Sequence, residues 1–160
     1  MLSARPFTRE DINPLIENMR YCDVREVETL GDTVRGVLEY GLQRSNPGLV
    51  ISSYLTGSPL AVFGVVPGGP ENYPARRIQK SAHGDIWMLA TDELVEKHGR
   101  EFARASRGWV DFLNTQYRCL SNIVDARNTV HIRWLEWCGF TFTENFLINS
   151  HTFRAFERVR

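Results

Sequence analysis

Residues 128–140, NTVHIRWLEWCGF, decide the fold of this chain. Apolar side chains recur through them at the spacing of a helix, at Val130, Trp134, Leu135 and Cys138, and this period predicts one buried helical face. Gly139 stands where a helix commonly ends in a left-handed residue. The apolar run over residues 120–126 comes before the helix and is typical of a strand. We therefore predict a strand, a helix and a further strand that begins at Phe140.

Another strand and helix precede this unit. Residues 86–90, IWMLA, are apolar on both faces of an extended chain, which is typical of a central strand covered by helices on each side. The helix after it carries one apolar stripe, formed by Phe102, Ala105, Trp109, Phe112 and Leu113. Strand-helix-strand connections of this kind form right-handed crossovers, so residues 86–90 and 120–124 are expected to be adjacent parallel strands.

The first half of the chain begins with a strand over residues 2–7, followed by two helices. Thr8 is a suitable N-cap for the first helix, whose apolar residues are Ile12, Leu15, Ile16 and Met19. Asp32 or Thr33 caps the second helix, and the sequence SNPG at residues 45–48 ends it.

The middle and the end of the chain change to the pattern of strands. Residues 49–55 and 60–66 are strand-like, and the turn sequence TGSP between them predicts an antiparallel hairpin. Residues 67–82 lack a period and are expected to form a long loop. Residues 140–158 close the chain with two strands hinged near Asn149 and Ser150. The result is an α/β class protein with a mixed, twisted sheet flanked by helices on both faces.

Seven side chains at inward positions around the central strands are expected to be buried: Trp87, Leu89, Phe102, Trp109, Val124, Leu135 and Phe140. Trp137 lies off the apolar stripe of its helix. Core packing accounts for the other tryptophans better than nucleic-acid stacking does.

Composition limits the class of protein. The chain has 160 residues, 42% of them hydrophobic and 24% charged, which suits one globular domain over residues 1–160. The formal net charge is +0, so nothing points to nucleic acid or an anionic membrane. Three Cys without a C-x-x-C pair fit a reducing compartment. With no signal-like or membrane-spanning segment, we expect a cytoplasmic protein.

The order of these elements resembles that of the GNAT (Gcn5-related N-acetyltransferase) superfamily. The densest match is residues 128–140, where Asn128, Gly139 and Phe140 have the separations found in that superfamily. The segments RPFTREDI at residues 5–12 and LAVFGVV at residues 60–66 resemble its opening segment and third strand.

A narrower resemblance lies in residues 87–112 and 124–140 together. These segments are similar to small acyltransferase-like proteins of short-tailed phages, which resemble an internal virion protein of coliphages. That likeness implies a phage virion or host protein as partner. It also implies the host cytoplasm or the virion as the location.

The GNAT resemblance implies a splay between the fourth and fifth strands that holds acetyl-CoA. The backbone of Leu89, Ala90 and Thr91 would pair with the pantetheine arm, and Asn128 opens the last helix. A glycine-rich turn would offer amides to the pyrophosphate, and the corresponding residues are 93–101, of which the resemblance assigns His98, Gly99 and Arg100. Gly99 would then need a conformation that a Cβ obstructs. The alternative is a plain helix start, because the same residues include Glu93, Glu96 and Glu101.

Catalytic groups are harder to assign. The resemblance implies a Tyr seven positions after Asn128, but Leu135 stands there. His131 lies one turn earlier and is a candidate acid, or a structural histidine. Asp92 and Asp125 are candidate bases at strand ends, or a helix cap and a backbone hydrogen-bond acceptor. The histidines are scattered without ligand spacing, so no metal site is expected.

Two functional hypotheses follow. The first is an active acyl-CoA-dependent N-acetyltransferase acting on an amine of a protein or small molecule. The second is a phage-type GNAT-fold protein with lost or weakened acetyl transfer, which acts in the virion or on a host partner. The single glycine at residues 93–101 and the Leu at position 135 favour the second hypothesis.

Overall fold

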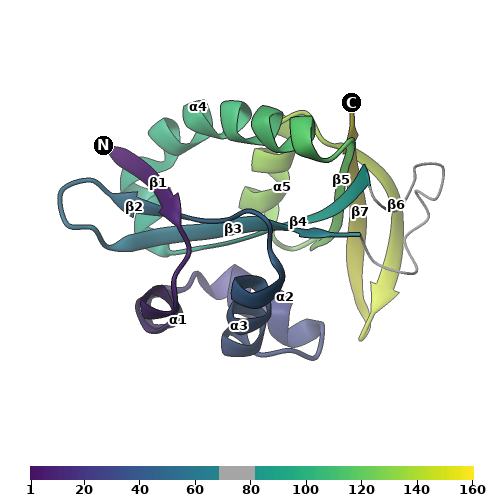
Figure 1. Ribbon diagram of the computed structural model, residues 1–160. Coiled ribbons are helices and arrows are strands. Elements are labelled where there is room, and N and C mark those ends of the chain that lie inside the picture. The colour runs from purple at the N-terminus through teal and green to yellow at the C-terminus, as the bar shows by residue number, and fades with distance from the viewer. Residues whose placement is uncertain (69–81) are drawn as a thin grey trace.

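The computed structural model describes residues 1–68 and 82–160. The predicted loop at residues 67–82 therefore lies almost wholly outside the described residues. Seven strands form one sheet in the order β1-β2-β3-β4-β5-β7-β6, and helices cover both of its faces (Figure 1). The strands are β1 (Leu2–Pro6), β2 (Gly48–Ser53), β3 (Pro59–Pro67), β4 (His83–Ala90), β5 (Cys119–Asp125), β6 (Thr141–Ile148) and β7 (His151–Val159).

The helices divide between the two faces of the sheet. They are the 3-10 turn η1 (Arg9–Asp11), α1 (Ile12–Asn18), α2 (Tyr21–Thr29), α3 (Val34–Arg44), α4 (Asp92–Gln116) and α5 (Thr129–Trp137). Figure 1 shows α1, α2 and α3 on one face, and α4 and α5 on the other. The sheet is mixed, because β4 and β5 are parallel while the other neighbours are antiparallel. These findings confirm the α/β class.

The parallel pair is short and then diverges. β4 and β5 pair only at His83 with Cys119, Gly84 with Leu120, and Asp85 with Ser121. From Ile86 onward, β4 pairs with β3 alone. The predicted splay between the fourth and fifth strands is therefore present, and we call this opening the wedge.

The helical region before residue 31 differs from the prediction of a single helix. The helix breaks between α1 and α2, where Met19 and Arg20 both have ψ of 136°. Met19 forms a bridge with Thr91, and the backbone N–H of Arg20 donates to the carbonyl of Ala90 at 3.0 Å. Contact with the end of β4 thus overrides the local helical pattern. Because of this break, α2 begins at the open end of the wedge.

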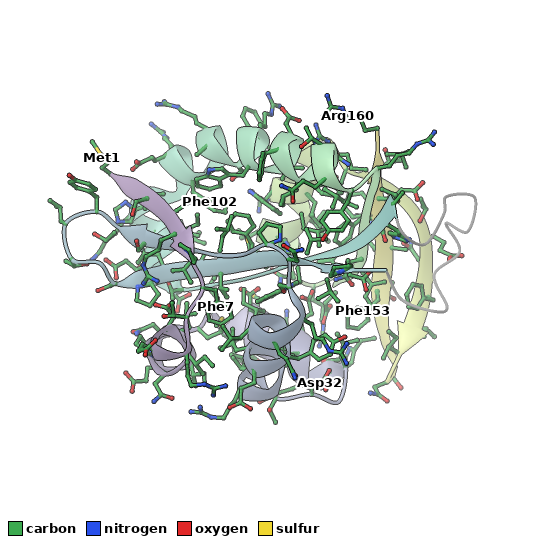
Figure 2. All side chains as sticks on the ribbon, in the orientation of Figure 1. Met1, Phe7, Asp32, Phe102, Phe153 and Arg160 are labelled. Atoms are coloured by element: carbon green, nitrogen blue, oxygen red, sulfur yellow. The ribbon has the colours of Figure 1, made fainter. Side chains whose placement is uncertain are left out.

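Each face of the sheet has its own core. One cluster lies under α4 and α5 and includes Phe102, and the other lies under α1 to α3 and includes Phe7; Figure 2 shows these two side chains on opposite sides of the sheet. Of the seven predicted core residues, five are buried: Leu89, Phe102, Val124, Leu135 and Phe140. Trp87 and Trp109 are only partly buried, whereas Trp137 is 45% exposed.

Other sequence predictions are confirmed at the ends of elements. The Thr33 hydroxyl accepts from the Gly36 N–H and caps α3. Gly139 has φ of 84°, as expected of a left-handed residue after a helix. Asn149 and Ser150 both have positive φ, at the turn from β6 to β7. The sequence did not predict that β7 lies between β5 and β6.

Candidate functional site

The wedge leaves backbone groups of β4 without a neighbouring strand. Successive residues of a strand direct their N–H and C=O to opposite sides. Toward the wedge, the carbonyl of Ile86 accepts from Asn122 Nδ2 at 2.8 Å, and the N–H of Ala90 donates to Asp23 Oδ2 at 2.9 Å. Met88 lies between these two residues, so its N–H and C=O also face the wedge.

Two cavities adjoin the wedge, and one of them is lined from both faces of the sheet. The α4–α5 cavity has a volume of about 190 Å³, and its wall includes Leu94, Gly99 and Val130. The wedge cavity has a volume of about 130 Å³, and residues of α2 and α3 contribute to its wall. Three side chains line both cavities: Met88, His131 and Trp134. The two cavities therefore adjoin inside the wedge.

A buried polar cluster closes the open end of the wedge. Asp23 Oδ1 accepts from Arg20 Nη1 at 3.1 Å and from Asn128 Nδ2 at 3.0 Å. Its Oδ2 accepts from the Ala90 N–H. Arg20, Asp23 and Asn128 are at most 7% exposed. The cluster ties α2, the end of β4 and the start of α5 together.

Two titratable side chains line the wedge cavity, Glu26 and His131. Burial raises the pKa of Glu26 to about 8, although its carboxylate accepts from the Asp125 N–H at 2.6 Å. Burial lowers the pKa of His131; the charge of Asp23 opposes this effect, and that of Arg20 adds to it. The Nδ1 atom of His131 is buried and has no hydrogen-bond partner. At neutral pH the wedge therefore holds a carboxyl group that retains a proton and an imidazole that is neutral.

The start of α4 differs from a glycine-rich phosphate turn. β4 ends at Ala90, Thr91 is the N-cap, and α4 begins at Asp92. The hydroxyl of Thr91 accepts from the Leu94 N–H, and the first turn carries Asp92 and Glu93. Acidic side chains at a helix N-terminus stabilise the helix dipole and oppose an anionic ligand.

The predicted phosphate residues lie within this helix rather than on a turn. His98, Gly99 and Arg100 follow two turns of α4. A Cβ added at Gly99 would meet no atom within 4 Å, so the expectation that Gly99 adopts an obstructed conformation is wrong. The reason is that α4 starts directly after Thr91 and leaves no loop. Gly99 nevertheless lines the α4–α5 cavity, whereas His98 and Arg100 are absent from its wall.

The side chains of the two candidate aspartates are absent from the walls of both cavities. Asp92 is exposed on the first turn of α4. Asp125 is buried and holds Arg127, whose Nη2 lies 2.6 Å from Asp125 Oδ2. Burial alone would raise the pKa of Asp125, but hydrogen bonds from Arg127 outweigh burial and lower it. Neither carboxylate lines the two cavities, and their catalytic roles stay predictions.

The remaining predicted residues surround the end of β4. Ala90 lines the α4–α5 cavity and Leu89 the wedge cavity. Thr91 is buried, and its N–H donates to the carbonyl of Leu60. Asn128 belongs to the buried polar cluster. The structure thus brings together Leu89, Ala90, Gly99, Asn128 and His131, while their binding roles stay predictions.

Sequence reasoning missed the contribution of α2. Arg20, Asp23 and Glu26 follow one another at intervals of three, so they share one helical face. Such a charged face is usually solvated, and only its packing against β4 shows that it belongs to the site.

Within residues 1–68 and 82–160, no group of three or more His, Cys, Asp or Glu side chains is arranged to hold a metal ion. In the same residues, no helix has both the length and the apolar character needed to cross a membrane.

Several solved structures with the same fold are described as acetyltransferases. An aminoglycoside acetyltransferase in complex with coenzyme A matches with a TM-score of 0.68 and 16% identity, over 100% of this chain and 95% of that chain. A putative phosphinothricin N-acetyltransferase matches with a TM-score of 0.68 and 11% identity, over 99% and 98%. A GNAT-family acetyltransferase from Bacillus anthracis matches with a TM-score of 0.69 and 12% identity, over 99% and 94%. The chain has the GNAT acetyltransferase fold.

In sequence, the chain is similar to a phage protein family. Residues 79–147 match the family model described as Bacteriophage T7, probable scaffold protein Gp13. The match covers less than half of the chain. No curated protein matches the sequence.

Proposed function

We propose that this protein is an acyl-CoA-dependent N-acetyltransferase whose acyl donor lies in the wedge between β4 and β5. The observation that carries the proposal is the divergence of these strands after three residue pairs, with two cavities that share Met88, His131 and Trp134. Structures of the same fold contain coenzyme A or acetyl-CoA, which supports the choice of donor.

The wedge suits the pantetheine arm of acetyl-CoA. The arm carries amide groups, and the N–H and C=O of Met88 are available to pair with them. The wall of the α4–α5 cavity is mostly apolar, with Leu94, Phe102 and Val130 among its residues. Acetyl-CoA, when bound, supplies an activated acetyl group.

The phosphate end of the donor needs a binding group other than a glycine-rich turn, because only Thr91 separates the end of β4 from the start of α4. Two cations line the α4–α5 cavity, Arg20 and Arg133. Arg20 is buried and paired with Asp23. Arg133 is exposed and forms no ion pair within the described part of the chain, so we assign the phosphates to Arg133.

The two titratable groups of the wedge cavity, His131 and Glu26, are the groups that would transfer protons. An amine nucleophile must lose a proton, and the neutral imidazole of His131, with an unpartnered Nδ1, is suited to accept it. The leaving thiolate must gain a proton, and Glu26 retains one at neutral pH. His131 adjoins both cavities, which supports a role at the point where donor and acceptor meet.

A second candidate function is a virion-associated or host-interaction protein without acetyl transfer. It is favoured by the match of residues 79–147 to the phage scaffold model and by the acidic first turn of α4. In that case the fold persists while the site has changed its use. The partner would be a phage virion protein or a host protein.

The two candidates differ in one test, the stabilisation of the protein by acetyl-CoA. Gly99→Leu places an isobutyl group in the α4–α5 cavity, whereas Gly108→Leu is a matched control on the same helix. An added Cβ meets no atom within 4 Å at either glycine, and Leu is a better helix former than Gly. Both variants are therefore expected to fold.

For the enzyme, millimolar acetyl-CoA raises the melting temperature of the wild type and of Gly108→Leu, but not of Gly99→Leu. Release of free CoA thiol in the presence of amines then reports transfer. Unchanged melting curves for all three proteins would overturn the acyltransferase proposal and leave the second candidate.

A further inference from the structure

A third cavity extends the wedge cavity along β4 on the side of α3. Its volume is about 150 Å³, and Tyr40, Gly41 and Asp85 contribute to its wall. It shares Val37, Trp87 and Asn122 with the wedge cavity. Together the two cavities form one path, which we call the acceptor groove, with Glu26 toward one end and Asp85 toward the other.

Within the described part of the chain, no hydrogen bond or ion pair accounts for the burial of Asp85 Oδ1. Its Oδ1 atom is buried and accepts no hydrogen bond, and no cation within residues 1–68 and 82–160 pairs with it. Burial raises the pKa of Asp85 to about 7. A buried carboxylate oxygen without a donor is costly, and a cation would remove that cost. The guanidinium of Arg44 lies over the ring of Tyr40, 5.8 Å from its centroid, and is not part of the groove wall.

Trp87 gives the groove a fixed aromatic wall. Its indole Nε1 donates to the hydroxyl of Ser45 at 2.7 Å. A Cβ on Gly41 would lie 2.3 Å from the ring, so the bare helix face at Gly41 lets the ring pack closely. An immobile aromatic wall suits an alkyl chain or an ammonium group.

The acceptor groove and the α4–α5 cavity differ in the charged side chains of their walls. Among residues 1–68 and 82–160, the wall of the acceptor groove contains Glu26 and Asp85 and no Lys or Arg. In the same residues, the wall of the α4–α5 cavity contains Arg20 and Arg133 and no Asp or Glu. Because Glu26 retains its proton at neutral pH, Asp85 is the carboxyl group of the described groove wall that can carry a negative charge. The α4–α5 cavity therefore suits an anionic ligand, and the Asp85 end of the groove suits a cation.

We infer that the acceptor groove selects a dication, in which one amine lies beside Glu26 and His131 and a second cationic group pairs with Asp85. This inference rests on the proposed function. From Asp85 to Met88 the strand rises about 10 Å over three residues, which sets the separation of the two nitrogens. Long polyamines and basic peptides both offer this chemistry.

The test is binding of amines to the protein without acetyl-CoA, measured by calorimetry. The probes are spermidine, a blocked dilysine peptide, the short diamine ethylenediamine and the monoamine butylamine. We expect spermidine or the peptide to bind at least about tenfold more tightly than butylamine or ethylenediamine, and the tighter of the two identifies the source of the dication.

Variants then separate a specific site from general attraction. Asp85→Asn is expected to abolish the preference for the long dication. Asp32→Asn removes the same charge from an exposed position on the same side of the sheet (Figure 2), and is expected to leave the preference intact. Equal binding of all four amines, or equal losses in both variants, would overturn the inference. A separate titration with acetyl-CoA tests the proposed function, so the two failures are distinguishable.

Discussion

Replacement of Asp23 by Ala is expected to be among the most destabilising single changes in this protein. The carboxylate accepts from the Ala90 N–H at 2.9 Å, from Arg20 Nη1 at 3.1 Å and from Asn128 Nδ2 at 3.0 Å. Asp23→Ala leaves all three donors buried without this partner. It also leaves Arg20, which is 7% exposed, as a buried charge without an acid. Breaking a buried ion pair from one side costs about 3–5 kcal/mol.

Urea denaturation at pH 7 measures this cost as a shift in the midpoint at constant slope. Asp111→Ala is the control, because it removes the partner of Arg158 while its own side chain is 62% exposed. An exposed pair contributes less than about 1 kcal/mol. If Asp23→Ala and Asp111→Ala destabilise the protein equally, the cluster does not hold the end of the wedge, and our account of the break between α1 and α2 fails.

Two further predictions concern pH and packing. Burial raises the pKa of Glu26 from an ordinary value of 4.5 to about 8. As the pH rises, the unfolded chain therefore releases this proton before the folded protein does. Glu26 thus lowers the free energy of unfolding as the pH rises from 4.5 to about 8. Glu26→Gln should therefore be more stable than the wild type by about 3 kcal/mol at pH 7 and equal to it at pH 4; a difference that does not change with pH would contradict this assignment. Trp109 stacks on Phe63 with ring centroids 5.8 Å apart, and Trp109→Ala should cost about 3 kcal/mol. Trp137→Ala, at a 45% exposed site, should cost about 1 kcal/mol, and the reverse order of melting temperatures would refute this account of the core.

The sequence predicted the second half of the fold well because local signals and tertiary structure agree there. The apolar period through residues 128–140 and Gly139 after it produce α5 and the turn that ends it. The doubly apolar residues 86–90 lie in β4, between helices on both faces (Figure 1). A sequence pattern predicts structure reliably where the local preference of the residues agrees with the tertiary fold.

Prediction failed where a tertiary contact opposes the local pattern. The helix before Arg20 breaks because this residue pairs with the end of β4, and no breaker residue marks the position. Prediction of the α2 side chains of the site failed for the same reason. Asp23 and Glu26 have the spacing of an ordinary solvated face, yet they lie against the wedge.

Gly99 illustrates the opposite error. The resemblance assigned this glycine to a remnant of a phosphate turn, with a plain helix start as the alternative. It lies in the interior of α4, where an added Cβ would meet no atom within 4 Å, as the alternative implies. Its place on the wall of the α4–α5 cavity depends on how α4 packs against α5. A sequence pattern does not contain that information.

Calorimetric titration of the wild-type protein with acetyl-CoA tests the central claim most directly. An open wedge with a cavity between α4 and α5 predicts saturable binding of one acetyl-CoA per chain. At about a hundredfold excess over Kd, linkage predicts a rise of about 3 kcal/mol in the free energy of unfolding. Absence of heat, together with an unchanged stability at millimolar acetyl-CoA, would contradict the claim that the wedge holds an acyl donor.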